Sequence, residues 1–163
     1  MPAGACLSWT SRAVPQARVV ELTDRLLGMG VFEVAVSDTI GVATPGQVAD
    51  MVEALSPRVP VEAIALHLHD TRGTALANVF AALEAGVSTF DASAGGLGGC
   101  PFAPGASGNL STEDLVYMLH GLGIQTGVDL DAVVGASRLM APSIGHALPS
   151  RYLQATTSRT PNP

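Results

Sequence analysis

Residues 61–91 of the 163-residue chain read VEAIALHLHDTRGTALANVFAALEAGVSTFD. The mostly apolar run over residues 61–67 is typical of a buried strand. The alanine-rich segment over residues 73–85 predicts a helix, and Gly86 is a typical helix stop. The run over residues 87–91 predicts another strand. This stretch therefore encodes a strand, a helix and a second strand.

The same alternation extends in both directions from this stretch. Upstream, the pattern predicts a helix over residues 15–27, a strand over 31–36 and a helix over 45–55 that is opened by Thr44 and Pro45. Downstream, it predicts a Gly/Pro-rich loop over residues 93–109, a helix that begins at Ser111 or Thr112, and a last helix over residues 129–140. Strands that alternate with helices at this spacing predict right-handed βαβ units around a parallel sheet.

Two α/β architectures fit this pattern, and periodicity alone does not separate them. Three strands with covering helices can form a small open sheet. They can also be part of a (β/α)₈ barrel, which has eight strands and typically about 250 residues, so the chain would then hold only part of the ring. Residues 1–14 show no helical or strand period and predict a non-native or disordered start, while residues 155–163 predict a disordered tail.

Composition excludes several classes of protein. The formal charge of −6 and the absence of a Lys/Arg cluster argue against nucleic-acid binding, which draws most of its affinity from phosphate contacts. No apolar run approaches the length of about 20 residues that a transmembrane helix needs. Two cysteines, Cys6 and Cys100, are too few for a disulfide framework, so we expect a reducing compartment, the cytoplasm.

Reactive side chains follow each expected strand, where the active site of either architecture lies. His67 and His69 are two positions apart at the end of a strand, so both imidazoles point to the same side, about 6–7 Å apart along the chain. Two convergent imidazoles can hold one divalent metal ion. The alternative is a pair of core or surface histidines that are hydrogen-bonded to neighbouring groups.

Asp38 and Cys100 each allow two interpretations. Asp38 follows an apolar strand, where a partly desolvated carboxylate could act as a base, or it could bond the backbone N–H groups of the next turn. Cys100 lies among glycines, where a thiol that is mostly protonated at neutral pH could donate a proton, or it could be a bystander. We expect structural or solvated roles for His120 and His146, and no functional role for Cys6.

Three motifs occur together and in order: SDTIGVATPG over residues 37–46, HLHDTRG over 67–73 and GGLGGCPFAPGASGN over 95–109. This set resembles the 3-hydroxy-3-methylglutaryl-CoA lyases, from about Pro15 to beyond Ala141. The resemblance implies a (β/α)₈ TIM barrel of which this chain holds only the later strands and helices. The lyase domain would then span residues 15–154.

The resemblance also implies a site and a reaction. His67, His69 and Asn109 match the metal ligands of this family, and the metal is Mg²⁺ or Mn²⁺. Cys100 matches the catalytic cysteine, and Asp38 matches an aspartate implicated in proton transfer, a role that His67 could share. The substrate would be an acyl-CoA, 3-hydroxy-3-methylglutaryl-CoA, cleaved to acetoacetate and acetyl-CoA in leucine catabolism and ketone-body formation.

One departure and two alternatives accompany this interpretation. The family's first strand carries an Arg and a metal-ligating Asp, and no segment before Pro15 matches it, so we expect a second copy of the chain or a complementary barrel fragment as partner. The related isopropylmalate and homocitrate synthases share the His-x-His pair, but have a Gly-Glu-Arg segment where this chain has Cys-Pro-Phe-Ala-Pro. The other alternative is a non-catalytic remnant.

Overall fold

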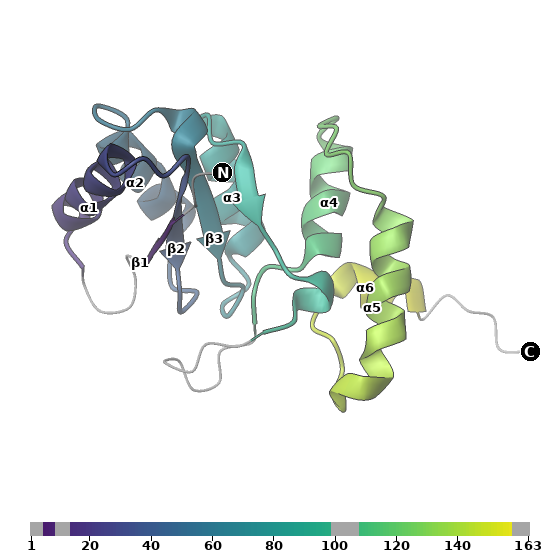
Figure 1. Cartoon of the computed structure of the whole chain (residues 1–163). Coiled ribbons are helices and arrows are strands. Elements are labelled where there is room, and N and C mark those ends of the chain that lie inside the picture. Colours follow the sequence, from purple (N-terminus) through teal and green to yellow (C-terminus); the bar gives the residue numbers. More distant parts are fainter. Residues whose placement is uncertain (1–4, 9–13, 99–107, 158–163) are drawn as a thin grey trace, which may run out of the picture.

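The computed structural model of the chain describes residues 5–8, 14–98 and 108–157. Its centre is a parallel sheet of four strands, in which each strand pairs with the next one along the sequence. The strands are β1 (Ala5–Ser8), β2 (Val34–Asp38), β3 (Ile64–Leu68) and β4 (Thr89–Asp91). Figure 1 shows the sheet and the helices that pack beside it.

Helices follow the strands in the order that the sequence predicts. The first three are α1 (Gln16–Gly28), α2 (Pro45–Leu55) and α3 (Ala75–Glu84), which connect successive strands. The last three are α4 (Thr112–Gly121), α5 (Leu130–Ile144) and α6 (Arg151–Thr157). They pack together beyond the β4 edge of the sheet (Figure 1).

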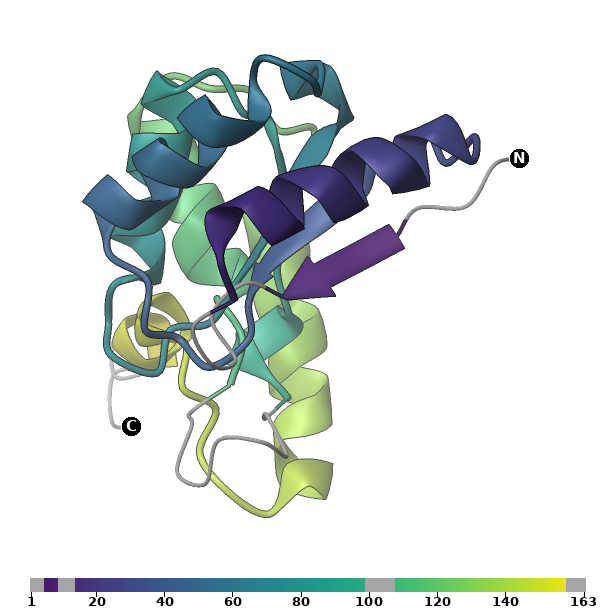
Figure 2. The same ribbon diagram turned by 90° about the vertical axis from the view of Figure 1, so that its left-hand side faces the viewer.

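The order of the strands decides between the two architectures that the sequence left open. A doubly wound sheet reverses its strand order at a switch point and carries helices on both faces. Here the order is sequential, and right-handed crossovers in a sequential parallel sheet place the connecting helices α1, α2 and α3 on the same face. Figure 2 shows this face from the side, with α1 beside β1 and β2. The predicted partial (β/α)₈ barrel is confirmed.

The two faces of the sheet carry different side chains. Val36, Ile64, Leu66 and Leu68 are fully buried and pack against helix residues such as Val48, Met51, Leu55 and Val79. Because side chains alternate along a strand, Ala35, Ser37, Ala65 and His67 face the other side, which is the inside of a complete barrel. The second face therefore carries small or polar side chains, which leave room for a site. A smaller core cluster of Val134, Leu148 and Leu153 holds α5 and α6.

Local signals account for the helix boundaries that the sequence predicted well. The α2 helix has its predicted bounds because Pro45 fits the first turn and the Gln47 side chain accepts a hydrogen bond from the Thr44 N–H. The β3 strand begins later than expected, since residues 61–63 form a 3₁₀ turn. No helix in the described part of the chain is long and apolar enough to cross a membrane.

Two elements were not expected. The start of the chain was predicted to lack structure, but β1 pairs with β2 over four residues, too few to show a period in sequence. The tail was predicted to be disordered from residue 155, but α6 extends to Thr157. Its first turn is held by Asp114, whose carboxylate accepts hydrogen bonds from the N–H groups of Arg151 and Tyr152. A contact over this sequence distance leaves no local pattern.

Candidate active site

The register of the sheet sets out the candidate site along the carboxyl ends of three strands. Ser37 on β2 pairs with His67 on β3, and His67 pairs with Asp91 on β4. Paired residues of neighbouring strands point to the same face, so these side chains form one row across the sheet. The row lies on the face without helices.

The two predicted imidazoles meet at the end of this row. The Nε2 atoms of His67 and His69 are 3.1 Å apart, and the ring centroids are 5.0 Å apart. Both rings thus turn the same nitrogen toward one point, as the strand alternation predicted.

Asp91 holds the first imidazole in place. Its Oδ1 atom lies 2.5 Å from Nδ1 of His67. This hydrogen bond is the main reason that the pKa of His67 is raised above its ordinary value, and burial opposes it. A carboxylate on Nδ1 fixes a proton there, so Nε2, which lies in contact with Nε2 of His69, is the nitrogen that a cation would bind.

His69 is in a different environment. It is buried, and burial lowers its pKa, an effect to which the positive charge of a protonated His67 adds. Its Nδ1 atom has no hydrogen-bond partner among the described residues. Burial thus favours the neutral form of this imidazole, which is the form that binds metal ions.

Asn109 lies beside the imidazole pair because the chain returns to β3 after the glycine-rich segment. Its backbone forms an antiparallel bridge with His69, and the Leu110 N–H donates to the Leu68 carbonyl at 3.0 Å. The side-chain Nδ2 donates to the Leu97 carbonyl at 3.0 Å. Because the amide nitrogen is engaged in this way, Oδ1 is the amide atom that remains for a cation.

Glycines allow a very close approach at this point. A Cβ atom on Gly108 would lie 2.3 Å from the Gly96 oxygen and 2.6 Å from the Gly98 oxygen, and the φ angle of Gly108 is +51°. Only glycine fits such a contact with two backbone oxygens. The residue before Asn109 is therefore packed directly onto the turn that binds the Asn109 amide.

Asp38 bonds the backbone of the next turn, which was one of the two interpretations of this residue. Its buried carboxylate accepts hydrogen bonds from the N–H groups of Val42 at 3.0 Å and Ala43 at 2.9 Å. Its negative charge is also among the influences that raise the pKa of both imidazoles, so it lies within electrostatic reach of them. A role in proton transfer stays a prediction.

The remaining predicted residues are outside this group. Cys100 lies outside the described residues. His120 contacts the Thr126 hydroxyl at 3.1 Å and His146 contacts the Ala147 carbonyl at 3.0 Å, both on exposed side chains.

The residues present fit a divalent cation. Two adjacent ligands of an octahedral ion, each at about 2.1 Å, lie about 3.0 Å apart, close to the spacing of the two Nε2 atoms. The described residues contain no cluster of three or more His, Cys, Asp and Glu side chains. His67, His69 and Asn109 would therefore share the ion with water, substrate or ligands from elsewhere.

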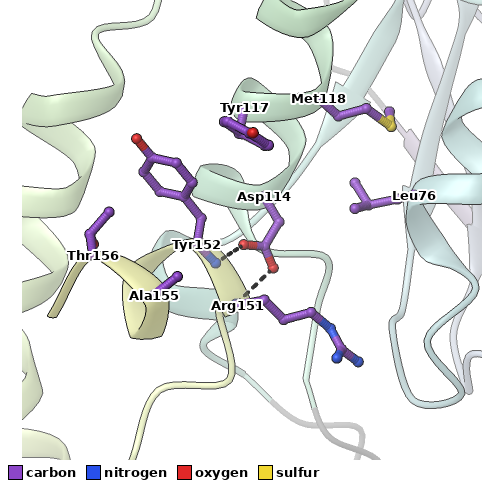
Figure 3. A pocket seen from close by; sticks show the side chains of 8 residues that line it. All are labelled: Leu76, Asp114, Tyr117, Met118, Arg151, Tyr152, Ala155 and Thr156. Atoms are coloured by element: carbon purple, nitrogen blue, oxygen red, sulfur yellow. Dashed lines mark hydrogen bonds between the residues drawn. The ribbon is translucent and has the colours of Figure 1, made fainter. Parts of the chain in front are cut away.

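A cavity of about 640 Å³ lies apart from these residues, between α3, α4 and α6. Figure 3 shows its lining: Leu76, Asp114, Tyr117, Met118, Arg151, Tyr152, Ala155 and Thr156. The Asp114 carboxylate that points into it is engaged by the backbone of α6. None of the predicted site residues lines this cavity, so its volume says nothing about the imidazole pair.

Sequence reasoning missed the part that Asp91 plays. It noted that Asp91 ends a strand but gave the residue no role. The signal in the sequence was that His67 and Asp91 each lie at the end of an expected strand, and that these two strands follow one another along the chain. It becomes a contact only when the register of the two strands is known.

We expect Gly108→Ala to disrupt the contact between Asn109 and the glycine turn. A matched control is Gly127→Ala, because Gly127 also has a positive φ angle, +70°, but has no atom within 4 Å of an added Cβ. The control should cost about 1–2 kcal/mol of unfolding free energy. Gly108→Ala should cost clearly more in urea denaturation, and equal costs would contradict the packing described here.

We expect Asp91→Asn to lower the pKa of His67. The substitution removes the carboxylate that favours the imidazolium form, so His67 should lose its proton at a lower pH than in the parent chain. Proton NMR titration of the metal-free chain measures this. An unchanged His67 titration would show that Asp91 does not control this imidazole.

Comparisons with known proteins agree with the geometry. The HMGL-like family model matches residues 7–140. A hydroxymethylglutaryl-CoA lyase of Bacillus subtilis is 51% identical over 145 residues, which cover 89% of this chain and 48% of that protein. The chain thus spans about half the length of the curated relatives it matches.

Solved structures give the same result. The crystal structure of the Bacillus subtilis HMG-CoA lyase matches 96% of this chain and 54% of its own, with a TM-score of 0.92 and 47% identity. An HMG-CoA lyase from Acinetobacter baumannii, in complex with coenzyme A and 3-methylmalate, matches 98% of this chain and 54% of its own, with a TM-score of 0.87 and 40% identity. Enzymes of this kind generally depend on a divalent metal. The strand order, the imidazole row and the extent of the match together lead to one conclusion: the chain belongs to the HMGL-like family.

Proposed function

We propose that this chain forms the metal-binding wall of a carbon–carbon lyase that cleaves 3-hydroxy-3-methylglutaryl-CoA to acetoacetate and acetyl-CoA. The observation that carries the proposal is the convergence of the His67 and His69 Nε2 atoms, 3.1 Å apart, beside Asn109. The lyase names of relatives at about 50% identity support this substrate over those of the related synthases.

His67, His69 and Asn109 would hold the ion, which we propose is Mg²⁺ or Mn²⁺. Mn²⁺ accepts imidazole nitrogens as well as oxygens, and Asn109 offers an oxygen. When bound, the ion would supply Lewis-acid polarisation of the substrate oxygens.

The proposed reaction needs a base for the hydroxyl proton on C3 of the substrate. His67 keeps its Nδ1 proton against Asp91, so its only free lone pair is on Nε2, the atom that a cation would occupy. Asp38 is then the base in this metal-dependent reaction. The buried Asp38 carboxylate is held by the N–H groups of Val42 and Ala43, and its charge acts on both imidazoles.

Loss of that proton starts the bond cleavage. A carbonyl forms at C3, the C2–C3 bond breaks, and its electron pair passes to C2 as the enolate of acetyl-CoA. Cys100 donates its thiol proton to C2, which completes acetyl-CoA, and acetoacetate is the other product. Asp38 and Cys100 thus serve two separate proton transfers: Asp38 accepts the hydroxyl proton, and Cys100 donates a proton to C2.

The partners are proposals as well. The substrate is an acyl-CoA, and the Acinetobacter baumannii relative holds coenzyme A. Among the described strands, β1 and β4 each pair on one side only. We propose that further strands, from a second copy of the chain or from a complementary barrel fragment, cover these edges in the active protein, which would act in the cytoplasm.

We expect His67→Ala to weaken Mn²⁺ binding at least about tenfold, because it removes a ligand rather than an outer contact. Isothermal titration calorimetry of the parent chain, His67→Ala and His120→Ala measures this. The control His120→Ala should bind like the parent because its contact is with Thr126. Equal affinities for parent and His67→Ala would rule out the site, and a folded parent with neither Mn²⁺ binding nor acetoacetate production would support the non-catalytic alternative.

We expect Cys100→Ser to lower the rate of acetoacetate production by about 10²–10⁴, since a positioned proton donor contributes that much. Mn²⁺ affinity should stay unchanged, which separates a lost acid from a damaged site. Cys6→Ser is the control for loss of a thiol elsewhere. A Cys100→Ser chain as active as the parent would exclude the thiol as proton donor.

A further inference from the structure

One buried carboxylate has no part in the proposed reaction. Glu113, in the first turn of α4, is fully buried. Its two oxygens accept hydrogen bonds from the Gly95 N–H at 2.9 and 3.0 Å, from the Ser111 hydroxyl at 2.8 Å and from the Ser137 hydroxyl. None of the ion pairs among the described residues involves it. Helix capping does not need such a group, since Ser111 already caps α4.

The three donors come from three separate segments. Gly95 lies in the turn over residues 94–98, Ser111 precedes α4, and Ser137 lies on α5. Loss of a hydrogen bond to a buried carboxylate strongly destabilises the folded state. The carboxylate therefore holds its three donors at fixed distances from one another. Glu113 therefore fixes the position of the turn relative to α4 and α5.

The same turn also binds the side chain of Asn109. The Leu97 carbonyl accepts the hydrogen bond from the Asn109 Nδ2 atom, and a Cβ atom on Gly98 would lie 2.7 Å from that nitrogen. Any shift of the turn moves the acceptor that sets which way the amide faces. The path from Glu113 to the candidate ligand thus consists of Gly95, the turn and Leu97.

We infer that Glu113 is a positioning residue for the metal site: by anchoring the 94–98 turn, it aims the Asn109 amide so that Oδ1 faces the imidazole pair. The inference rests on the proposed metal site. It extends that site to a carboxylate that touches neither metal nor substrate, and it assigns Ser137 on α5 to the same device.

The test is a double-mutant cycle on Mn²⁺ affinity, measured by calorimetry on the full chain. Glu113→Gln puts an amide NH₂ among three donors, so Mn²⁺ binding should weaken about tenfold, the lower end for groups that orient a ligand. In the Asn109→Ala background the same substitution should weaken it no further, because the group being aimed is gone. Additive losses, as from a general weakening of the fold, would overturn the inference.

Two more variants keep the test decisive. Asp114→Asn, on the next residue of α4, loosens the contacts to α6 rather than to the turn, so it should lower the melting temperature without changing Mn²⁺ affinity. Ser137→Ala removes one donor and leaves α4 intact, and it should weaken Mn²⁺ binding in the direction of Glu113→Gln. If Glu113→Gln does not fold, an unchanged affinity in Ser137→Ala overturns the inference.

The cycle also separates this inference from the proposed site. If Asn109→Ala alone leaves Mn²⁺ affinity unchanged, the assignment of Asn109 as a ligand fails and the inference falls with it. If Asn109→Ala weakens binding but Glu113→Gln and Ser137→Ala do not, the ligand stands and the positioning role alone is wrong.

Discussion

The candidate site depends on the backbone hydrogen bonds that return the chain to the end of β3. The Leu110 N–H donates to the Leu68 carbonyl, and the Asp70 N–H donates to the Gly108 carbonyl at 3.4 Å. These bonds place Asn109 beside His69, although the two residues are separated by a helix, a strand and the glycine-rich segment. Without them the imidazole pair would lack Asn109 as a third candidate ligand.

The site is otherwise built from contacts that serve two purposes. Asp91 orients His67 and also raises its pKa, and Asp38 closes the turn after β2 while its charge acts on both imidazoles. Glycine backbone packs against glycine backbone where a side chain would separate Asn109 from its turn. These contacts therefore hold the site side chains in defined orientations, as a preorganised metal site requires.

Much of the fold follows from local sequence signals, and much of the site does not. Thr44-Pro45 marks the start of α2, and strand alternation predicts that His67 and His69 share a face, because both are properties of a few neighbouring residues. The β1 strand is four residues long and α6 is capped by Asp114 across a long sequence distance, so neither has a local signature. The contacts of Asp91 and Glu113 depend on strand register and on tertiary packing, which no single-sequence pattern contains.

The central claim is that two imidazole nitrogens converge on one divalent ion at the carboxyl end of β3. Pulsed electron paramagnetic resonance of the Mn²⁺-loaded chain tests it most directly, because electron spin-echo modulation detects nitrogen nuclei bound to the ion. We expect modulation from two histidine nitrogens in the parent chain and from one in a chain with His69→Ala. An Mn²⁺ ion bound without any nitrogen modulation would contradict the claim.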